Sequence, residues 1–413
     1  MDKIQTFKKN GKAGVIYVME KASKKGFYYG NKKWANLGQG APELGMIQNC
    51  PPRISEVKIP QINHGYAPVA GVKELRKSVA NIYNNLFRKD LDSKLSLENV
   101  SIAGGGRVAL SRIFASMEQI NVGYFLPDYA SYEGILSVFN NINPIAYELE
   151  SKNHFKINLD RLKEFIEENK IKALLLSNPT NPTGNLLYGD SLKKLVEIAK
   201  EMEFTLILDE FYFNYIFIDS ENYVSAQKYI KDVNSDPVVI IAGLTKPWRY
   251  PGWRICWAIA PKDIQDLITS TGSFLDGGAN HPLQNAALNL LKLDQLRKES
   301  KAIKTHFRNK RDYMIKRLKA MNIKIDNKPE GAFYIWANLK DLPKPLNDGM
   351  KFFQKGLEEN FIVVPGIFFD LNPHSKRKNR KYQNYVRISY SSELKTIKKG
   401  LDSINRLIDK YSK

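Results

Sequence analysis

The residues with the clearest chemical potential lie around a lysine that follows an apolar run. Lys246 comes after VVIIAGL (238–244), precedes Pro247, and has Arg254 eight residues further on. A lysine in a partly dry site has a lowered pKa and can form a Schiff base with an aldehyde. An arginine can bind a phosphate through two parallel hydrogen bonds. The alternative for each residue alone is a solvated surface side chain.

Other polar residues also stand where a buried strand is expected to end. Asp209 closes TLILD, and a buried carboxylate is costly unless it is paired, for example with a protonated ring nitrogen. The alternative is that Asp209 caps the segment after it. In SNPTNPTG (177–184), two Asn-Pro steps enforce a rigid turn, which can aim the Asn181 amide at a ligand oxygen.

Two further stretches contain residues suited to binding anions. AGGGRVAL (103–110) places three glycines before a helix, where free backbone amides can bind phosphate, although a tight turn is an equal alternative. Arg387 lies in the alternating run YVRISYS (385–391). An arginine on an otherwise apolar strand suggests recognition of a planar carboxylate. The alternative is a surface arginine on an edge strand.

The scaffold that would bring these residues together is an alternation of strands and helices. Strand-like runs are expected at 100–104, 122–127, 144–150, 173–177, 205–209 and 238–244. Amphipathic helical runs lie between them, at 108–119, 131–140, 159–170 and 191–202. Such alternation predicts an α/β fold with a mostly parallel sheet and helices on both faces. Ligands of such sheets bind at the carboxyl ends of the strands, where the residues above cluster.

Length and composition predict a folded protein with more than one structural part. With 413 residues, 43% of them hydrophobic, the chain is too long for one simple core. No apolar run approaches the ~20 residues of a transmembrane helix, and we expect no secretory signal at the N-terminus. Cys50 and Cys256 are too few for a disulfide framework or a metal cluster. We therefore expect no metal site and a cytoplasmic location.

The net charge of +20 would permit binding to nucleic acids or membrane surfaces. The lysines are spread along the chain, however, with local runs only at KASKK and SKRKNRK, and no nucleic-acid-binding motif accompanies them. We expect a solvated basic surface and no nucleic-acid or membrane partner. The alternative is an acidic ligand or partner near Lys376–Lys381.

The predicted groups converge on one cofactor. A phosphate site, a carboxylate for a ring nitrogen, donors for a ring oxygen, a stacking aromatic and a Schiff-base lysine together describe pyridoxal phosphate. Their order along the chain resembles that of the class I/II aminotransferases, the fold-type-I enzymes that use this cofactor. The resemblance runs from NLGQGAPE (36–43) to YVRISYS and includes PDYASY (127–132), SNPTNPTG, LDEFY (208–212), the TK…PGWR block and GAFYIW (331–336).

The resemblance implies two domains and a set of roles at the cofactor ring. The large cofactor-binding domain would span 47–293, and a smaller α+β domain would combine 1–46 with 294–413. Lys246 is similar to the lysine that binds the cofactor aldehyde and later moves the Cα proton. Asp209 matches the carboxylate that keeps the ring nitrogen protonated. Asn181 and Tyr212 match the pair that hydrogen-bonds the ring oxygen. Tyr129 matches the aromatic residue that stacks on the ring.

The resemblance also assigns residues to the phosphate and to the substrate. Gly105, Gly106 and Arg107 would supply backbone amides to the phosphate, with Arg254 as its charge partner. Tyr66 is similar to a tyrosine that reaches the phosphate from a neighbouring subunit, which implies a homodimer. The substrate's carboxylate end would meet Gly40, Asn181 and Arg387, and its side chain would meet residues 13–19, Asn280 and His281.

Three positions depart from the family's pattern. Gly243 stands three residues before Lys246, where the family often has a hydroxyl residue. Gly106 replaces a frequent Ser or Thr, and Cys256 stands where a glycine is usual. Two hydroxyl contacts to phosphate would be missing, and Thr245 is a candidate to compensate for them.

The function that the resemblance implies is transfer of an amino group between an L-amino acid and a 2-oxo acid. One alternative keeps the cofactor and changes the reaction to elimination, cyclisation or oxidation, because the same carbanion serves all of them. The other is a cofactor-sensing regulator fused to a DNA-binding region. Because the family pattern already begins at residue 36, we do not expect such a region before it.

Overall fold

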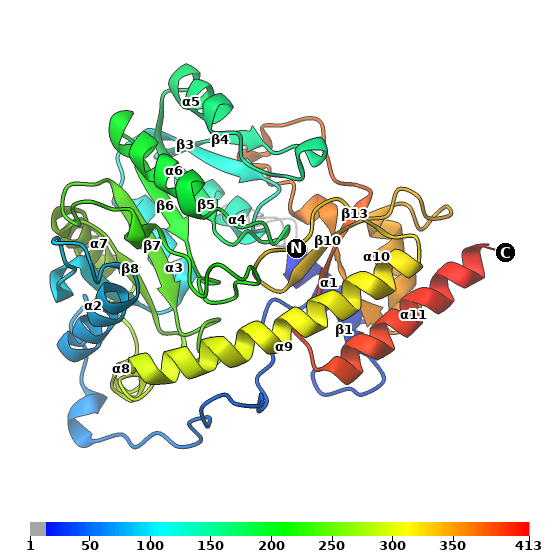
Figure 1. The fold of residues 1–413 in the computed structure, drawn as a ribbon, viewed down its shortest axis with the longest axis horizontal. Coiled ribbons are helices and arrows are strands. Elements are labelled where there is room, and N and C mark those ends of the chain that lie inside the picture. Colours follow the sequence, from blue (N-terminus) through cyan, green and yellow to red (C-terminus); the bar gives the residue numbers. More distant parts are fainter. Residues whose placement is uncertain (1–13, 413) are drawn as a thin grey trace, which may run out of the picture.

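The computed structural model describes residues 14–412 and contains one large sheet at its centre (Figure 1). This sheet has seven strands in the order β2-β8-β7-β6-β5-β3-β4, and all neighbours pair in parallel except at β8, which is antiparallel to both of its neighbours. The mostly parallel α/β sheet is therefore confirmed. The strands are β2 (Val100–Ala103), β3 (Ile120–Leu126), β4 (Ile142–Glu148), β5 (Ile171–Ser177), β6 (Thr205–Asp209), β7 (Val238–Gly243) and β8 (Cys256–Ile259).

Both faces of the large sheet are buried, as the alternation along its central strands shows. In β5, Leu174 and Leu176 pack on one face, whereas Ala173 and Leu175 pack on the other. Helices of the crossover connections cover the two faces, so the strands read as continuous apolar runs. One face is covered by α3 (Gly106–Ala115), α4 (Ser131–Val138) and α7 (Lys262–Leu275); the other by α2 (Lys73–Phe87), α5 (Leu159–Glu168) and α6 (Gly189–Glu201).

A second, smaller sheet lies on the other side of the molecule (Figure 1). Its order is β12-β13-β10-β9, with antiparallel pairing throughout. The N-terminal segment joins this part, because β1 (Ala35–Asn36) pairs with β11 (Phe361–Ile362). The remaining elements are β9 (Lys324–Ile325), β10 (Tyr334–Asn338), β12 (Val364–Pro365), β13 (Tyr385–Ser389), α1 (Gly14–Ser23), α10 (Gly349–Glu358) and α11 (Leu394–Ser412).

The long helix α9 (Leu293–Ala320) follows the short α8 (His281–Ala287) and runs from the large-sheet side to the small-sheet side (Figure 1). The predicted division into a large domain (47–293) and a small domain (1–46 with 294–413) agrees with this arrangement and stays a prediction. Within residues 14–412, no helix combines the length and the apolar character that crossing a bilayer requires.

Candidate active site

The carboxyl ends of β5, β6 and β7 open onto one cavity of about 370 Å³. Ten of the predicted site residues line it: Gly40, Gly106, Arg107, Tyr129, Asn181, Asp209, Tyr212, Lys246, Arg254 and Arg387. They come from both sheets and from the N-terminal segment. Val15 and Ile16 of α1 line it too, as expected for the stretch 13–19, of which residue 13 lies outside the described part of the chain.

Lys246 is half-buried, and its Nζ contacts the carbonyl oxygen of Gly40. Burial, followed by the positive charge of Arg387, lowers the pKa of the Lys246 amine to about 8. No carboxylate of the described residues forms an ion pair with Lys246, and the negative charge of Asp209, which raises this pKa, only partly offsets the effect of burial. A lysine of this kind holds a substantial neutral fraction near neutral pH and is a competent nucleophile.

Asp209 ends β6, is buried and lines the cavity. Its Oδ2 accepts a hydrogen bond from the Tyr132 hydroxyl at 2.8 Å, and burial raises the pKa of the Asp209 carboxyl to about 6. The backbone N–H of Phe211 is 3.4 Å from Oδ1, a distance too long for a strong cap. A buried carboxylate without a paired cation suits a ligand atom that carries a proton.

Arg387 lies on β13, which runs between β12 and β10, so the edge-strand alternative is wrong. The side chain is 1% exposed, and its Nη1 and Nη2 donate to Asn181 Oδ1 at 3.0 Å and to the Gly38 carbonyl at 2.7 Å. The guanidinium also lies over the Tyr334 ring, 4.3 Å from its centroid. All of these partners are neutral. A buried guanidinium that faces a cavity and contacts no carboxylate suits an anionic ligand.

Two glycines at the start of α3 lie close to other side chains, Gly105 to Arg254 and Gly106 to Phe211. Gly105 is the N-cap residue of α3 with φ 123°, and a Cβ built there would lie 1.8 Å from Arg254 Nη2. A Cβ at Gly106 would lie 2.6 Å from the Phe211 ring. Backbone amides therefore meet a guanidinium at a helix N-terminus, which is a favourable arrangement for phosphate.

The two missing hydroxyl groups have a packing explanation. Gly243 pairs with Cys256 across β7 and β8, and a Cβ at Gly243 would lie 2.7 Å from Cys256 Sγ. Cys256 thus occupies the space that a side chain at 243 would need, just as Phe211 does at Gly106. The hydroxyl of Thr245 remains at the cavity, 3.7 Å from Cys256 Sγ.

Several residues at the cavity are absent from the sequence-based predictions. The Tyr334 hydroxyl is 2.8 Å from that of Tyr212, and Ser177 lines the cavity beside Asn181. Tyr132, the partner of Asp209, packs its ring against Tyr129 with the centroids 5.3 Å apart. Tyr132 and Tyr334 lie inside PDYASY and GAFYIW, and this position within two family motifs is the sequence feature that could have identified them.

Some predicted residues lie away from the cavity. Tyr66 is fully exposed, and His281 contacts the Gly65 carbonyl outside the cavity; Asn280 caps α8 by accepting from the N–H of Leu283. The basic run near 376–381 is largely paired internally, with Arg377 on Asp370 and Lys381 on Glu148. Among residues 14–412, no group of His, Cys, Asp and Glu side chains could hold a metal ion.

Comparison with known proteins agrees with the geometry. The profile of the family "Aminotransferase class I and II" matches residues 32–404. The chain belongs to this family. An aspartate aminotransferase of Bacillus subtilis is 27% identical over 91% of this chain and 91% of its own length. A probable aminotransferase of Arabidopsis thaliana is 28% identical over 85% of this chain and 76% of its own length.

Solved structures share the fold at lower identity. The aspartate aminotransferase from Thermus thermophilus with maleate has a TM-score of 0.79 at 22% identity, covering 98% of both chains. An aromatic aminotransferase from Pyrococcus horikoshii has a TM-score of 0.75 at 22% identity, covering 92% of this chain and 97% of its own. Members of the family depend on pyridoxal phosphate. The cavity fits this group, because it combines an unpaired carboxylate, a lysine of lowered pKa and a glycine–arginine cradle.

The close approach of Gly105 to Arg254 yields a prediction about cofactor affinity. We expect Gly105→Ala to displace the Arg254 guanidinium and to raise the Kd of pyridoxal phosphate by about tenfold or more, since a hydrogen bond to a charged group contributes about 1.5–3 kcal/mol. Absorbance titration of the cofactor-free protein measures this. Gly104→Ala is the matched control, because a Cβ at Gly104 would meet nothing within 4 Å. Equal affinities of the two variants would contradict the prediction.

Proposed function

We propose that the amino-group transfer of this aminotransferase takes place in the cavity between the two sheets. The observation that carries the proposal is that Lys246 and Arg387 face one cavity from different sheets, each without a protein counter-ion. An amino acid has an amino group and a carboxylate at opposite sides of its Cα. A guanidinium for the carboxylate and an amine that can take the Cα proton are therefore present in the same space.

The cofactor side of the cavity would be held by residues of the large sheet. Pyridoxal phosphate, when bound, supplies an aldehyde for an amine and a ring that accepts the electron pair left when the Cα–H bond breaks. Asp209 would hold the ring nitrogen, Asn181 and Tyr212 the ring oxygen, and Tyr129 a ring face. The phosphate would be held by Arg254 with the backbone amides of Gly105, Gly106 and Arg107.

Lys246 and Arg387 would carry out the steps on the substrate. Arg387 binds the α-carboxylate and so orients the Cα–H bond, with Gly40 next to it leaving room for the substrate. The neutral amine of Lys246 would take the Cα proton at its Nζ and would give that proton up again later in the amino-group transfer. A pKa near 8 suits both directions of this transfer at neutral pH. Domain closure would exclude water during the transfer.

Replacing the lysine tests these roles directly. We expect Lys246→Ala to lose the covalent attachment of pyridoxal phosphate and to lower kcat by at least about 10³-fold, since it loses both nucleophile and base. Spectroscopy of the bound cofactor and half-reactions with a panel of amino acids measure both effects. Retention of the covalent attachment in the variant would refute the assignment of Lys246.

The same panel separates transamination from the other reactions of this cofactor. Wild-type protein should convert the bound cofactor to its amine form and release a 2-oxo acid. Release of ammonia, or consumption of oxygen without a 2-oxo acid acceptor, would instead favour elimination or oxidation.

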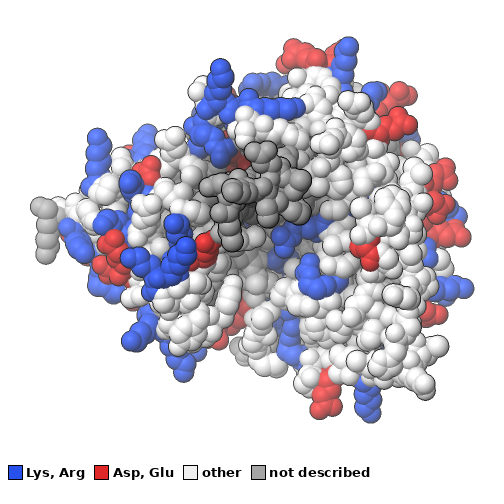
Figure 2. All heavy atoms as spheres, turned by 180° about the vertical axis from the view of Figure 1, so that it is seen from behind, with Lys and Arg blue, Asp and Glu red and all other residues white. Residues whose placement is uncertain are grey.

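For the substrate, we propose an amino acid with an acidic side chain. Arg107 lines the cavity, is exposed, and has no hydrogen-bond or ion-pair partner among the described residues. It is the third arginine of the cavity, after Arg254 for the phosphate and Arg387 for the α-carboxylate. Relatives named aspartate aminotransferases support an acidic substrate. Lysine and arginine side chains are also more abundant than acidic ones over the face in Figure 2, in line with the net charge of +20, which favours the approach of anions.

The substrate proposal predicts a selective loss. We expect Arg107→Gln to lower kcat/KM for aspartate and glutamate about 10- to 100-fold and to leave neutral amino acids within about twofold, because only the acidic side chain loses a charged partner. Arg297→Gln, an exposed arginine outside the cavity, is the control. Equal losses for acidic and neutral substrates would contradict this role for Arg107.

We further propose that the protein is a cytoplasmic homodimer. The free thiols of Cys50 and Cys256 are consistent with a reducing compartment. Five exposed apolar residues lie within one extended segment along the edge of the molecule (Figure 1): Leu44, Met46, Ile59, Ile62 and Tyr66. The exposed Phe274 and Leu275 end α7, which leads to Gly278 beside Val69. A second copy would cover this surface and bring Tyr66 to the partner's phosphate site.

The dimer proposal predicts that one charge on this surface separates the subunits. We expect Ile62→Asp to be monomeric in sedimentation and to bind pyridoxal phosphate more weakly, because Tyr66 no longer reaches the partner. Val138→Asp, at an exposed apolar residue of α4, should stay dimeric. A monomeric wild-type protein would refute the proposal.

A further inference from the structure

The segment 36–45, called the connecting strip below, supplies a carbonyl to each of the two cationic groups of the cavity. The Gly38 carbonyl accepts from Arg387 Nη2 at 2.7 Å, and the Gly40 carbonyl contacts Lys246 Nζ. The positions of Arg387 and Lys246 therefore both depend on where the connecting strip lies.

One side of the connecting strip is attached to the end of β13. The N–H of Ser389 donates to the Leu37 carbonyl at 2.7 Å. Gln39 Nε2 donates to the hydroxyls of Ser391 and Ser392, at 3.3 and 3.1 Å. These bonds join the strip to the strand that carries Arg387.

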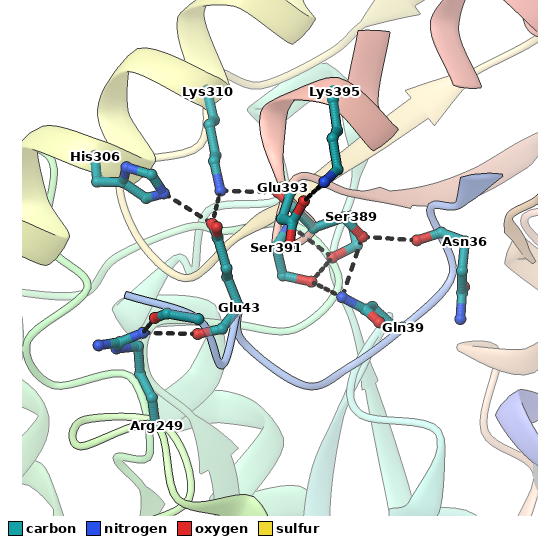
Figure 3. Close-up of polar contacts among 12 residues, drawn as sticks. Asn36, Gln39, Glu43, Arg249, His306, Lys310, Ser389, Ser391, Glu393 and Lys395 are labelled. Atoms are coloured by element: carbon teal, nitrogen blue, oxygen red, sulfur yellow. Dashed lines mark hydrogen bonds and ion pairs between the residues drawn. The ribbon is translucent and has the colours of Figure 1, made fainter. Parts of the chain in front are cut away.

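The other side of the connecting strip is held by Glu43, whose carboxylate lies between the side chains of His306 and Lys310 of α9 (Figure 3). Glu43 Oε2 is 2.8 Å from His306 Nε2 and also contacts Lys310 Nζ. Lys310, whose side chain is 3% exposed, donates in addition to the Ser392 carbonyl at 2.8 Å. Although burial alone would raise it, the hydrogen bonds from His306 and Lys310 lower the pKa of Glu43 to about 2. Glu43 is thus ionised at all physiological pH values.

The loop that follows Lys246 reaches the same place. Arg249 Nη1 donates to the carbonyls of Glu43 and Gly45, at 2.9 and 2.8 Å, and its Nε is 2.6 Å from Glu299 of α9. The N–H of Arg249 donates to the Lys246 carbonyl at 3.1 Å. The strip, α9, the end of β13 and the Lys246 loop therefore all meet at Glu43.

We propose that Glu43 and Lys310 are positioning residues, which hold the connecting strip so that its carbonyls keep Arg387 and Lys246 at the separation that one amino acid substrate needs. This inference rests on the proposed function of Arg387 and Lys246. Neither Glu43, Lys310 nor His306 lines the cavity, so they act on the substrate only through the strip. Small displacements of groups that orient a substrate have large effects on its reaction.

The test is the double variant Glu43→Gln/Lys310→Met, which removes both buried charges together and leaves neither unpaired. The matched control is Glu393→Gln/Lys395→Met, which removes an exposed pair at 2.7 Å beside the same cluster (Figure 3). The cofactor-loaded proteins are compared for KM and kcat with the best amino acid of the panel. The cofactor-free proteins are compared for the pH dependence of pyridoxal phosphate uptake, and all are compared for Tm.

In the double variant, we expect KM to rise about tenfold and the cofactor Kd to stay within about twofold. We also expect the midpoint of cofactor uptake to move to lower pH, because Lys246 loses the carbonyl acceptor that favours its ammonium form. The control should match wild type in all of these. A double variant with lowered Tm but wild-type KM and uptake midpoint would overturn the proposal, since the cluster would then contribute stability alone.

A second variant covers the case in which the double variant does not fold. Glu43→Asp keeps the charge and shortens the side chain by one methylene, so it should change KM and the uptake midpoint in the same directions, and wild-type values for both would overturn the proposal. If wild-type protein binds the cofactor but shows no half-reaction, the proposed function fails. In that case, the pH midpoints of pyridoxal phosphate uptake still test whether Glu43 and Lys310 position the connecting strip.

Discussion

The arrangement of the cavity depends on charged groups that are kept in a partly dry space without protein counter-ions. Lys246, Asp209 and Arg387 would each be more stable in water or opposite an opposite charge. The fold supports them with neutral groups instead, namely the Gly40 and Gly38 carbonyls and the Tyr132 hydroxyl. Neutral partners leave the net charges available to a ligand. Burial lowers the pKa of the Lys246 amine and raises the pKa of the Asp209 carboxyl, because in both cases it disfavours the charged form.

The large sheet supplies the rigidity that this arrangement requires. β5, β6 and β7 are parallel and buried on both faces, so their carboxyl ends place Asn181, Asp209 and Lys246 near one another. The antiparallel β8 completes the site from the other direction, because it brings Arg254 back to the start of α3. Arg387 comes from the smaller sheet, and the connecting strip relates the two.

Much of this was predictable from local patterns. The six expected strands are present within a few residues, because each is a mainly apolar run and most are bounded by Gly, Pro or Asn. The strand β8 was not predicted, since CWAI is short and follows a Pro-Gly turn without a helix between. The neighbours Tyr132 and Tyr334 lie inside recognisable family motifs, but their hydrogen bonds to Asp209 and Tyr212 join residues 77 and 122 positions apart, which the sequence does not show. Glu43 likewise looked like one more charged loop residue, since its partners lie more than 260 positions away.

The sequence by itself determined the set of chemical groups and the order in which they follow the strands, because strand ends are encoded locally by apolar runs and turn residues. It thereby determined the family resemblance and the cofactor chemistry. Only the tertiary structure decided which groups lack counter-ions, why Gly243 and Gly106 are glycines, and that one ion cluster joins the two sheets. These facts depend on contacts between distant segments, such as Cys256 against Gly243 and Lys310 against Glu43. Such contacts arise from packing in three dimensions, which no local pattern specifies.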